Sequence, residues 1–179
     1  MDKCRCKPRG FTLVEALVAL VLLAVLVALA APSLTGLRQR QQLRGLAEGF
    51  WNSLVLARAE AMARQQRVTV CALSAAGDCD ATGPWQRGWL VFVDANRNGQ
   101  REGDEPLLQR QGALPAGVSL VGNTPVRRVL VYSEEGRSIW VSGAFLAGTL
   151  TLCREGLNQG WDVVINPSGR PRLAPKDCP

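Results

Sequence analysis

The chain has 179 residues and a formal net charge of +6, from 21 Lys and Arg against 15 Asp and Glu. This length leaves room for a single domain of ordinary size together with a terminal segment. The sequence contains no histidine, which removes the commonest general base and the commonest metal ligand. We therefore expect no catalytic residues, no enzymatic activity and no cofactor.

Half of the net charge lies in the first ten residues, where four Lys and Arg side chains accompany Asp2. An apolar run from Leu13 to Ala31 follows, interrupted only by Glu15. The run has the roughly 18 residues that a membrane-spanning helix needs. The preceding cations predict that the N-terminus stays in the cytoplasm. We predict a leader over residues 1–10, one membrane-spanning helix over residues 11–31 and an exported head over residues 32–179.

Two simpler interpretations of this segment are a secretory signal peptide, since Ala28 and Ala30 offer small residues at alternate positions, and a plain membrane anchor. Neither explains Glu15, because an acid in a bilayer costs up to about 2.5–3.5 kcal/mol at the centre. An amine is the partner that we expect for this acid. If a peptidase cleaves after Gly10, the new amine of Phe11 can pair with Glu15 of a neighbouring subunit.

The segment from Arg9 to Glu15, with the sequence RGFTLVE, is followed by apolar residues and Pro32. It closely resembles the class III signal of type IV pilins and type II secretion pseudopilins. The resemblance implies that a prepilin peptidase cleaves the Gly10–Phe11 bond and methylates the Phe11 amine. It also implies that Glu15 guides the chain into a filament of other pilins or pseudopilins. The chain is then expected to be a single-pass protein of the bacterial inner membrane, with its head in the periplasm. The leader cysteines, Cys4 and Cys6, have no assigned role.

After Pro32 the pattern becomes amphipathic, with apolar residues at helical spacing and charged residues between them. We predict that the helix continues to about Gln66. Short β-type runs bounded by Gly, Pro, Asn and Asp follow it. These runs are residues 68–73, 89–93, 107–109, 118–121, 128–132, 139–142, 149–153 and 162–165. The sequence therefore predicts an α+β head in which an antiparallel sheet region packs on the helix.

Three segments narrow the resemblance to the GspH/FimT branch of the family: Ala57–Ala61, Trp85–Gly99 and Gly103–Pro106. This branch contains FimT- and FimU-like minor pilins of type IV pili and GspH-like minor pseudopilins of type II secretion. The resemblance implies a helical spine with two β-sheets in the head. We expect a minor pilin, with the pseudopilin as the alternative.

Four cysteines follow the leader: Cys71, Cys79, Cys153 and Cys178. They lack the matched spacing of a zinc site and are expected to form two disulfides in an oxidising compartment. Three pairings are possible, and proximity in the sequence favours Cys71 with Cys79 and Cys153 with Cys178.

A possible metal site lies in the segment after residue 93. Asp94, Asn96 and Asn98 have the spacing of a calcium loop, and Glu105 stands where a closing bidentate glutamate would fall. The preceding strand and Pro106 do not fit a helix–loop–helix context. A β-connection rich in turn formers is therefore the favoured interpretation, and bound calcium is the alternative.

A basic cluster near the C-terminus is the candidate for nucleic acid binding. It comprises Arg170 and Arg172, within the sequence GRPR, and Lys176. Two guanidinium groups on a short loop stiffened by proline suit bidentate phosphate contacts that are largely independent of base sequence. GRPR also fits the GRxR motif of FimT-like pilins, which bind DNA during natural transformation. Double-stranded DNA is therefore an expected partner, and an exposed turn with two solvated arginines is the alternative.

Overall fold

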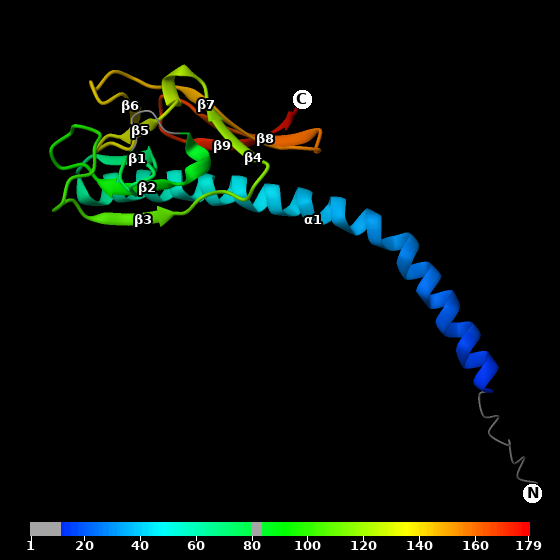
Figure 1. Cartoon of the computed structure of the whole chain (residues 1–179). Coiled ribbons are helices and arrows are strands. Elements are labelled where there is room, and N and C mark those ends of the chain that lie inside the picture. Colours follow the sequence, from blue (N-terminus) through cyan, green and yellow to red (C-terminus); the bar gives the residue numbers. More distant parts are fainter. Residues whose placement is uncertain (1–11, 80–83) are drawn as a thin grey trace, which may run out of the picture. The chain divides into compact units, whose positions relative to one another are not determined.

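The structure is a computed structural model that describes residues 12–79 and 84–179, without the side chains of residues 28–34. The chain divides into two units, residues 1–39 and residues 40–179. One helix, α1 (Leu13–Arg64), contributes to both units and ends two residues before the predicted boundary (Figure 1). The predicted cleavage bond between Gly10 and Phe11 and the cysteines Cys4 and Cys6 lie outside the described residues.

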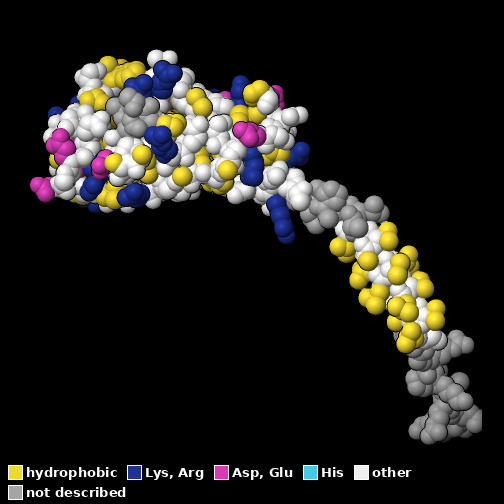
Figure 2. Space-filling view, in the orientation of Figure 1, with side chains coloured by type: hydrophobic (Ala, Val, Ile, Leu, Met, Phe, Trp, Pro, Cys, Tyr) yellow, Lys and Arg dark blue, Asp and Glu magenta, His cyan; other side chains and the backbone are white. Residues whose placement is uncertain are grey.

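In the first unit, Thr12 provides the cap at the start of α1. The backbone N–H of Glu15 donates to the Thr12 hydroxyl oxygen at 3.3 Å, and so satisfies one of the free donors of the first helical turn. The large apolar side chains from Leu13 to Val27 are each at least 51% exposed, and Figure 2 shows them as an apolar surface. Among the described residues, no helix combines the length and the apolar character needed to cross a membrane.

The head contains two antiparallel sheets that pack on α1, as the sequence predicts (Figure 1). The first sheet has five strands in the order β3 (Leu107–Gln111), β2 (Trp89–Val93), β1 (Val68–Ala72), β5 (Val129–Tyr132) and β6 (Ser138–Ile139). The second sheet has four strands in the order β4 (Val118–Gly122), β7 (Gly148–Arg154), β8 (Gln159–Ile165) and β9 (Pro171–Asp177). Two short 3-10 helices, η1 (Trp85–Arg87) and η2 (Thr124–Val126), lie in the connections.

Two segments differ from the prediction. Residues 140–142 form a turn rather than a strand, because Gly143 takes a positive φ of 91° and its N–H donates to the Trp140 carbonyl. Residues 171–177, for which the sequence predicts a loop and tail, form the edge strand β9. Pro171 and Pro175 make this strand difficult to predict from the sequence. Proline cannot donate to a β-ladder and is tolerated mainly at a sheet edge.

The core of the head lies between one face of α1 and the two sheets. Phe50 of α1 packs edge-on against Trp85 and Trp89, with ring centroids 5.4 and 4.9 Å apart. The indole N–H of Trp89 donates to the buried Ser53 hydroxyl at 2.9 Å, and that of Trp85 donates to the Val126 carbonyl at 3.1 Å. The buried α1 residues recur every three or four positions: Leu43, Ala47, Phe50, Leu54, Ala57 and Ala61.

Both disulfides favoured by the sequence are formed, Cys71–Cys79 and Cys153–Cys178, with Cα atoms 5.5 and 5.9 Å apart. The second disulfide joins β7 to the residue that follows β9 and passes over Gly160 of the intervening strand β8. A Cβ atom at this glycine would clash with the Cys178 sulfur. The disulfide therefore fastens the edge strand β9 to the rest of the second sheet.

Tyr132 is the only tyrosine of the chain, and it is fully buried in the core. Its hydroxyl has no hydrogen-bond partner in the described part of the chain. Burial raises the pKa of Tyr132 well above its ordinary range, although the nearby Arg58 guanidinium lowers it in part. In an unfolded chain a phenol ionises near pH 10. Above about pH 10 the unfolded state therefore binds fewer protons than the folded state, and stability falls as pH rises.

We expect the free energy of unfolding to decrease above about pH 10, by up to ~1.4 kcal/mol per pH unit from this tyrosine. Tyr132→Phe should remove that part of the pH dependence. It should leave stability at pH 7 unchanged or higher, because it deletes a buried hydroxyl that has no partner. Urea unfolding of both proteins at several pH values measures the difference. Tyrosinate absorbance from the still-folded wild-type protein would contradict the prediction.

Candidate functional site

The turn between β8 and β9 carries the first predicted arginine. Asn166 organises this turn: its side-chain Oδ1 accepts hydrogen bonds from the Arg170 N–H at 3.2 Å and from the Ser168 hydroxyl at 2.7 Å. The Asn166 carbonyl also accepts from the N–H of Gly169 at 2.9 Å. Gly169 has a φ of +77°, in the left-handed region that favours glycine. The glycine of the GRPR sequence is therefore required by the backbone of the turn.

Arg170, Arg172 and Lys176 are all exposed, but they do not share one loop. Arg170 lies in the turn, whereas Arg172 and Lys176 belong to β9, where they pair with Val164 and Gly160 of β8. Leu173 packs on the core, so alternation along the strand directs Arg172 and Lys176 to the opposite side. The two side chains are four residues apart, or roughly 13 Å along the strand. None of the three basic residues forms an ion pair with another described residue.

The structure adds two further arginines to the surroundings of Arg170. A Cβ atom at Gly169 would clash with the Gly136 carbonyl oxygen, so the β8–β9 turn lies directly against the β5–β6 turn. Arg137 immediately follows Gly136, and Arg58 of α1 donates to the Gly136 carbonyl at 2.9 Å. Three separate segments thus bring arginine residues to one close backbone contact: Arg58 through its guanidinium group, and Arg137 and Arg170 as the chain neighbours of Gly136 and Gly169. We refer to Arg58, Arg137 and Arg170 as the arginine cluster.

Acidic side chains border the arginine cluster. Glu134 forms an ion pair with Arg97 at 3.0 Å. Glu135 accepts a hydrogen bond from the Ser133 hydroxyl at 2.7 Å, and this bond lowers the pKa of Glu135, with a smaller effect from Arg137. The Glu135 carboxylate is therefore charged and partly offsets the positive potential of the cluster. Sequence reasoning missed Arg58 and Arg137 because no local pattern shows that they meet Arg170.

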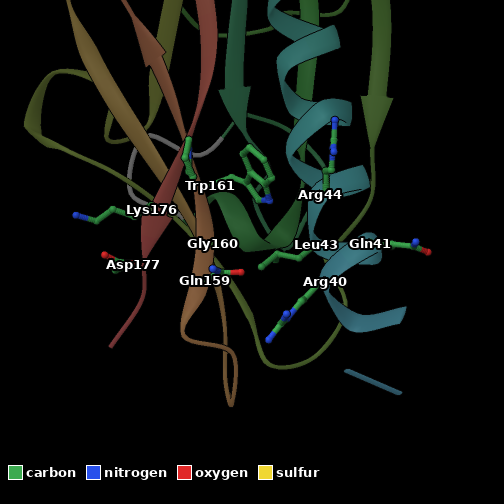
Figure 3. A pocket seen from close by; sticks show the side chains of 10 residues that line it. Arg40, Gln41, Leu43, Arg44, Gln159, Gly160, Trp161, Lys176 and Asp177 are labelled. Atoms are coloured by element: carbon green, nitrogen blue, oxygen red, sulfur yellow. The ribbon is translucent and has the colours of Figure 1, made fainter. Parts of the chain in front are cut away.

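A groove of about 530 Å³ lies between α1 and the strands β8 and β9 (Figure 3), and no residue of the arginine cluster lines it. Leu43 and Trp161 project into it, and the Arg44 guanidinium lies 5.6 Å from the centre of the Trp161 ring, a cation–π contact. Lys176 borders the groove, but its side chain points away from α1 (Figure 3). The groove is therefore not where the predicted basic residues converge.

The predicted calcium loop uses its own oxygen atoms to hold its shape. The buried Asp94 carboxylate accepts from the Thr69 hydroxyl at 2.8 Å and from the N–H groups of Asn98 and Gly99 at 3.1 and 3.0 Å. The Asn96 side-chain oxygen accepts from the Asn98 N–H, and that of Asn98 from the Gln100 N–H. Glu105 accepts from the N–H groups of Ala95, Asn96 and Glu102.

No group of three His, Cys, Asp or Glu residues in the described chain is placed to hold a metal ion. The hydrogen bonds within the loop support the interpretation as a β-connection. Calcium binding stays a prediction from the spacing of Asp94, Asn96, Asn98 and Glu105.

The fold, a long N-terminal helix packed on antiparallel sheets, is that of the pilin-like class. The chain belongs to the GspH family, because the model of type II transport protein GspH matches residues 46–169. A second model, the prokaryotic N-terminal methylation motif, matches residues 5–31 and so includes Gly10, Phe11 and Glu15. A comparison with the sequences of curated proteins gives no significant match.

Two kinds of solved structure resemble the chain. The type IV minor pilin FimU of Pseudomonas aeruginosa is 23% identical, with a TM-score of 0.59, and the likeness covers 78% of this chain and 95% of FimU. The minor pseudopilin EpsH from the type 2 secretion system of Vibrio cholerae is 18% identical, with a TM-score of 0.52, over 74% of this chain and 96% of EpsH. These likenesses show the fold alone. Membership of the GspH family, whose members are structural subunits, shows that the chain is not an enzyme.

Gly169→Ala should destabilise the head more than Gly156→Ala, which is a matched control with a φ of +78° and no atom within 4 Å of the added Cβ. Both substitutions carry the cost of a left-handed alanine, roughly 1–2 kcal/mol. Only Gly169→Ala also clashes with the Gly136 carbonyl, and we expect about 1–3 kcal/mol of further destabilisation. Urea unfolding followed by tryptophan fluorescence measures both losses. Equal losses would show that the two turns do not depend on their close contact.

Proposed function

We propose that the chain is a FimT- or FimU-like minor type IV pilin that assembles with other pilins through its N-terminal helix. The match to the methylation motif is the observation that carries the assembly part of this proposal, because the motif contains both the processing site and Glu15. The fold likeness to FimU supports it. A GspH-like minor pseudopilin is the second candidate, favoured by the matching family model and by the fold likeness to EpsH.

In this proposal, prepilin peptidase cleaves the Gly10–Phe11 bond and methylates the new amine of Phe11. Residues 11–31 anchor the chain in the inner membrane as a single span before assembly. The exposed apolar side chains from Leu13 to Val27 support this role, because they lack packing partners within the described part of the chain. The head resides in the periplasm, where an oxidising environment maintains both disulfides.

Two roles are considered for Glu15, pairing between subunits and capping of α1, and an experiment can separate them. Its exposed side chain can pair with the Phe11 amine of a neighbouring subunit and so set the register between helices. The spacing of Thr12 and Glu15 also matches a capping box, in which both residues stabilise the start of one helix. We propose the first role, because a cap alone does not require an acid inside an apolar segment.

Arg170 and Arg172 are proposed to contact the phosphates of DNA. Both side chains are exposed, neither forms an ion pair with a described residue, and Arg170 belongs to the arginine cluster. Neighbouring cations raise the local positive potential and favour a polyanion. Lys176 lies further along β9 and provides an additional contact for a long ligand.

Glu15→Ala should leave cleavage by prepilin peptidase largely intact and strongly reduce incorporation into filaments. Thr12→Ala is the matched control, because it removes the helix cap and retains the carboxylate. Quantitative immunoblots of processed protein and of sheared filaments measure the two effects. Normal incorporation of the Glu15→Ala chain would contradict the proposed pairing, and equal losses from both substitutions would assign Glu15 to the capping box.

Replacing both Arg170 and Arg172 with Gln should strongly weaken binding of duplex DNA at low salt, and should reduce the slope of log K against log salt by about two. The charge-matched control replaces Arg127 and Arg128, which are exposed and precede β5 at the end away from Gly136. Fluorescence anisotropy with the full chain in non-ionic detergent gives both quantities, and the leader contributes equally to all variants. Unchanged affinity in the first variant would remove the DNA contact and leave the assembly proposal standing.

A further inference from the structure

The segment between β6 and β7 exposes two aromatic side chains. Phe145 is 63% exposed, and Trp140 is 37% exposed. The segment is well ordered by backbone hydrogen bonds, since the Trp140 N–H donates to the Ala144 carbonyl at 2.8 Å and the Leu146 N–H donates to the Ser138 carbonyl at 3.0 Å. Its aromatic side chains are therefore held outward by a folded hairpin. We refer to residues 138–146 as the aromatic hairpin.

The aromatic hairpin is joined directly to the turn that carries Arg170. The Ser138 hydroxyl oxygen is buried and lies 2.7 Å from the carbonyl oxygens of both Leu146 and Asn166, so its proton can serve either. Asn166 in turn accepts the hydrogen bond from the Arg170 N–H. Ser138 and Asn166 thus connect the start of the hairpin to the arginine-bearing turn, with the Ser138 proton shared between the Leu146 and Asn166 carbonyls. This arrangement fixes the hairpin beside the arginine cluster.

Arg137 links the charge of the cluster to the aromatic surface. Its guanidinium carbon lies 5.2 Å from the centre of the Phe145 ring, a cation–π contact. Arg137 can cover only one face of the ring, and the large exposed fraction of Phe145 leaves an aromatic surface open to solvent. An exposed aromatic ring beside one arginine, on a hairpin bonded to the turn that carries a second, matches the combination that proteins use for single-stranded nucleic acids, where bases stack on rings and cations hold phosphates.

We propose that Phe145 stacks on an unpaired base of single-stranded DNA while Arg137 and Arg170 hold the adjoining phosphates. This inference rests on the proposed DNA contact and names the form of DNA that the site prefers. Bases of a duplex are stacked on one another and cannot present a free face to Phe145, so the ring adds affinity only for a single strand or a frayed end. The arginines serve both forms of DNA.

The test compares Phe145→Leu with the wild-type full chain in non-ionic detergent. Leucine retains apolar volume but removes the aromatic face. Leu107→Ala is the control, because Leu107 is 43% exposed on β3, at the opposite edge of the same sheet from β6. Fluorescence anisotropy with an oligo-dT strand and with a duplex of equal length gives the affinities at several salt concentrations, and thermal unfolding confirms that each variant is folded.

We expect Phe145→Leu to weaken binding of the single strand about tenfold, with duplex affinity and the salt slope unchanged. The control should change neither affinity. Equal binding of the single strand by Phe145→Leu and the wild type would overturn the inference, as would equal weakening of both DNA forms. A loss of filament incorporation without a loss of single-strand affinity would also overturn it, and would assign Phe145 to a subunit contact. If the wild type binds neither DNA form, the proposed DNA contact itself fails.

Discussion

The packing of one face of α1 against both sheets is the constraint on which the head depends. Phe50 contacts Trp85 and Trp89, and the buried residues before and after it on α1 reach both sheets. Each sheet buries a face against the core, and the helix is the layer that both sheets share. A smaller cluster on the other face of the first sheet, around Leu90 and Phe92, includes the Cys71–Cys79 disulfide.

The surface that we propose for DNA binding depends on the packing of the sheets against α1. The β5–β6 turn lies on α1 because Arg58 donates to the Gly136 carbonyl, and Gly136 leaves no room for a side chain beside Met62. The β8–β9 turn then lies on the β5–β6 turn through Gly169. Because Gly136 and Gly169 have no side chains, the helix and both sheets can approach one another at one point. The three arginines lie near that point because backbone contacts bring together the segments that carry them.

Membership of the GspH family does not determine the system in which the chain works. FimU belongs to type IV pili and EpsH to a type 2 secretion system, yet both resemble this fold over most of their length. A shared fold can serve both systems, because use depends on the side chains that the fold displays. In this chain the displayed features are Arg170 and Arg172, the arginine cluster around Gly136 and the aromatic hairpin.

The sequence by itself determined the features that local patterns encode: the helix from its apolar spacing, most strands from β-type runs between turn formers, and the disulfide pairs from proximity. It missed β9, because Pro171 and Pro175 mask a strand whose pairing with β8 compensates for its low propensity. It found Arg170 and Arg172 but not their neighbours. Only the tertiary structure brought Arg58, Arg137 and Phe145 to that turn, since contacts between residues 28 to 78 positions apart depend on sheet register and close backbone approach, which no local pattern records.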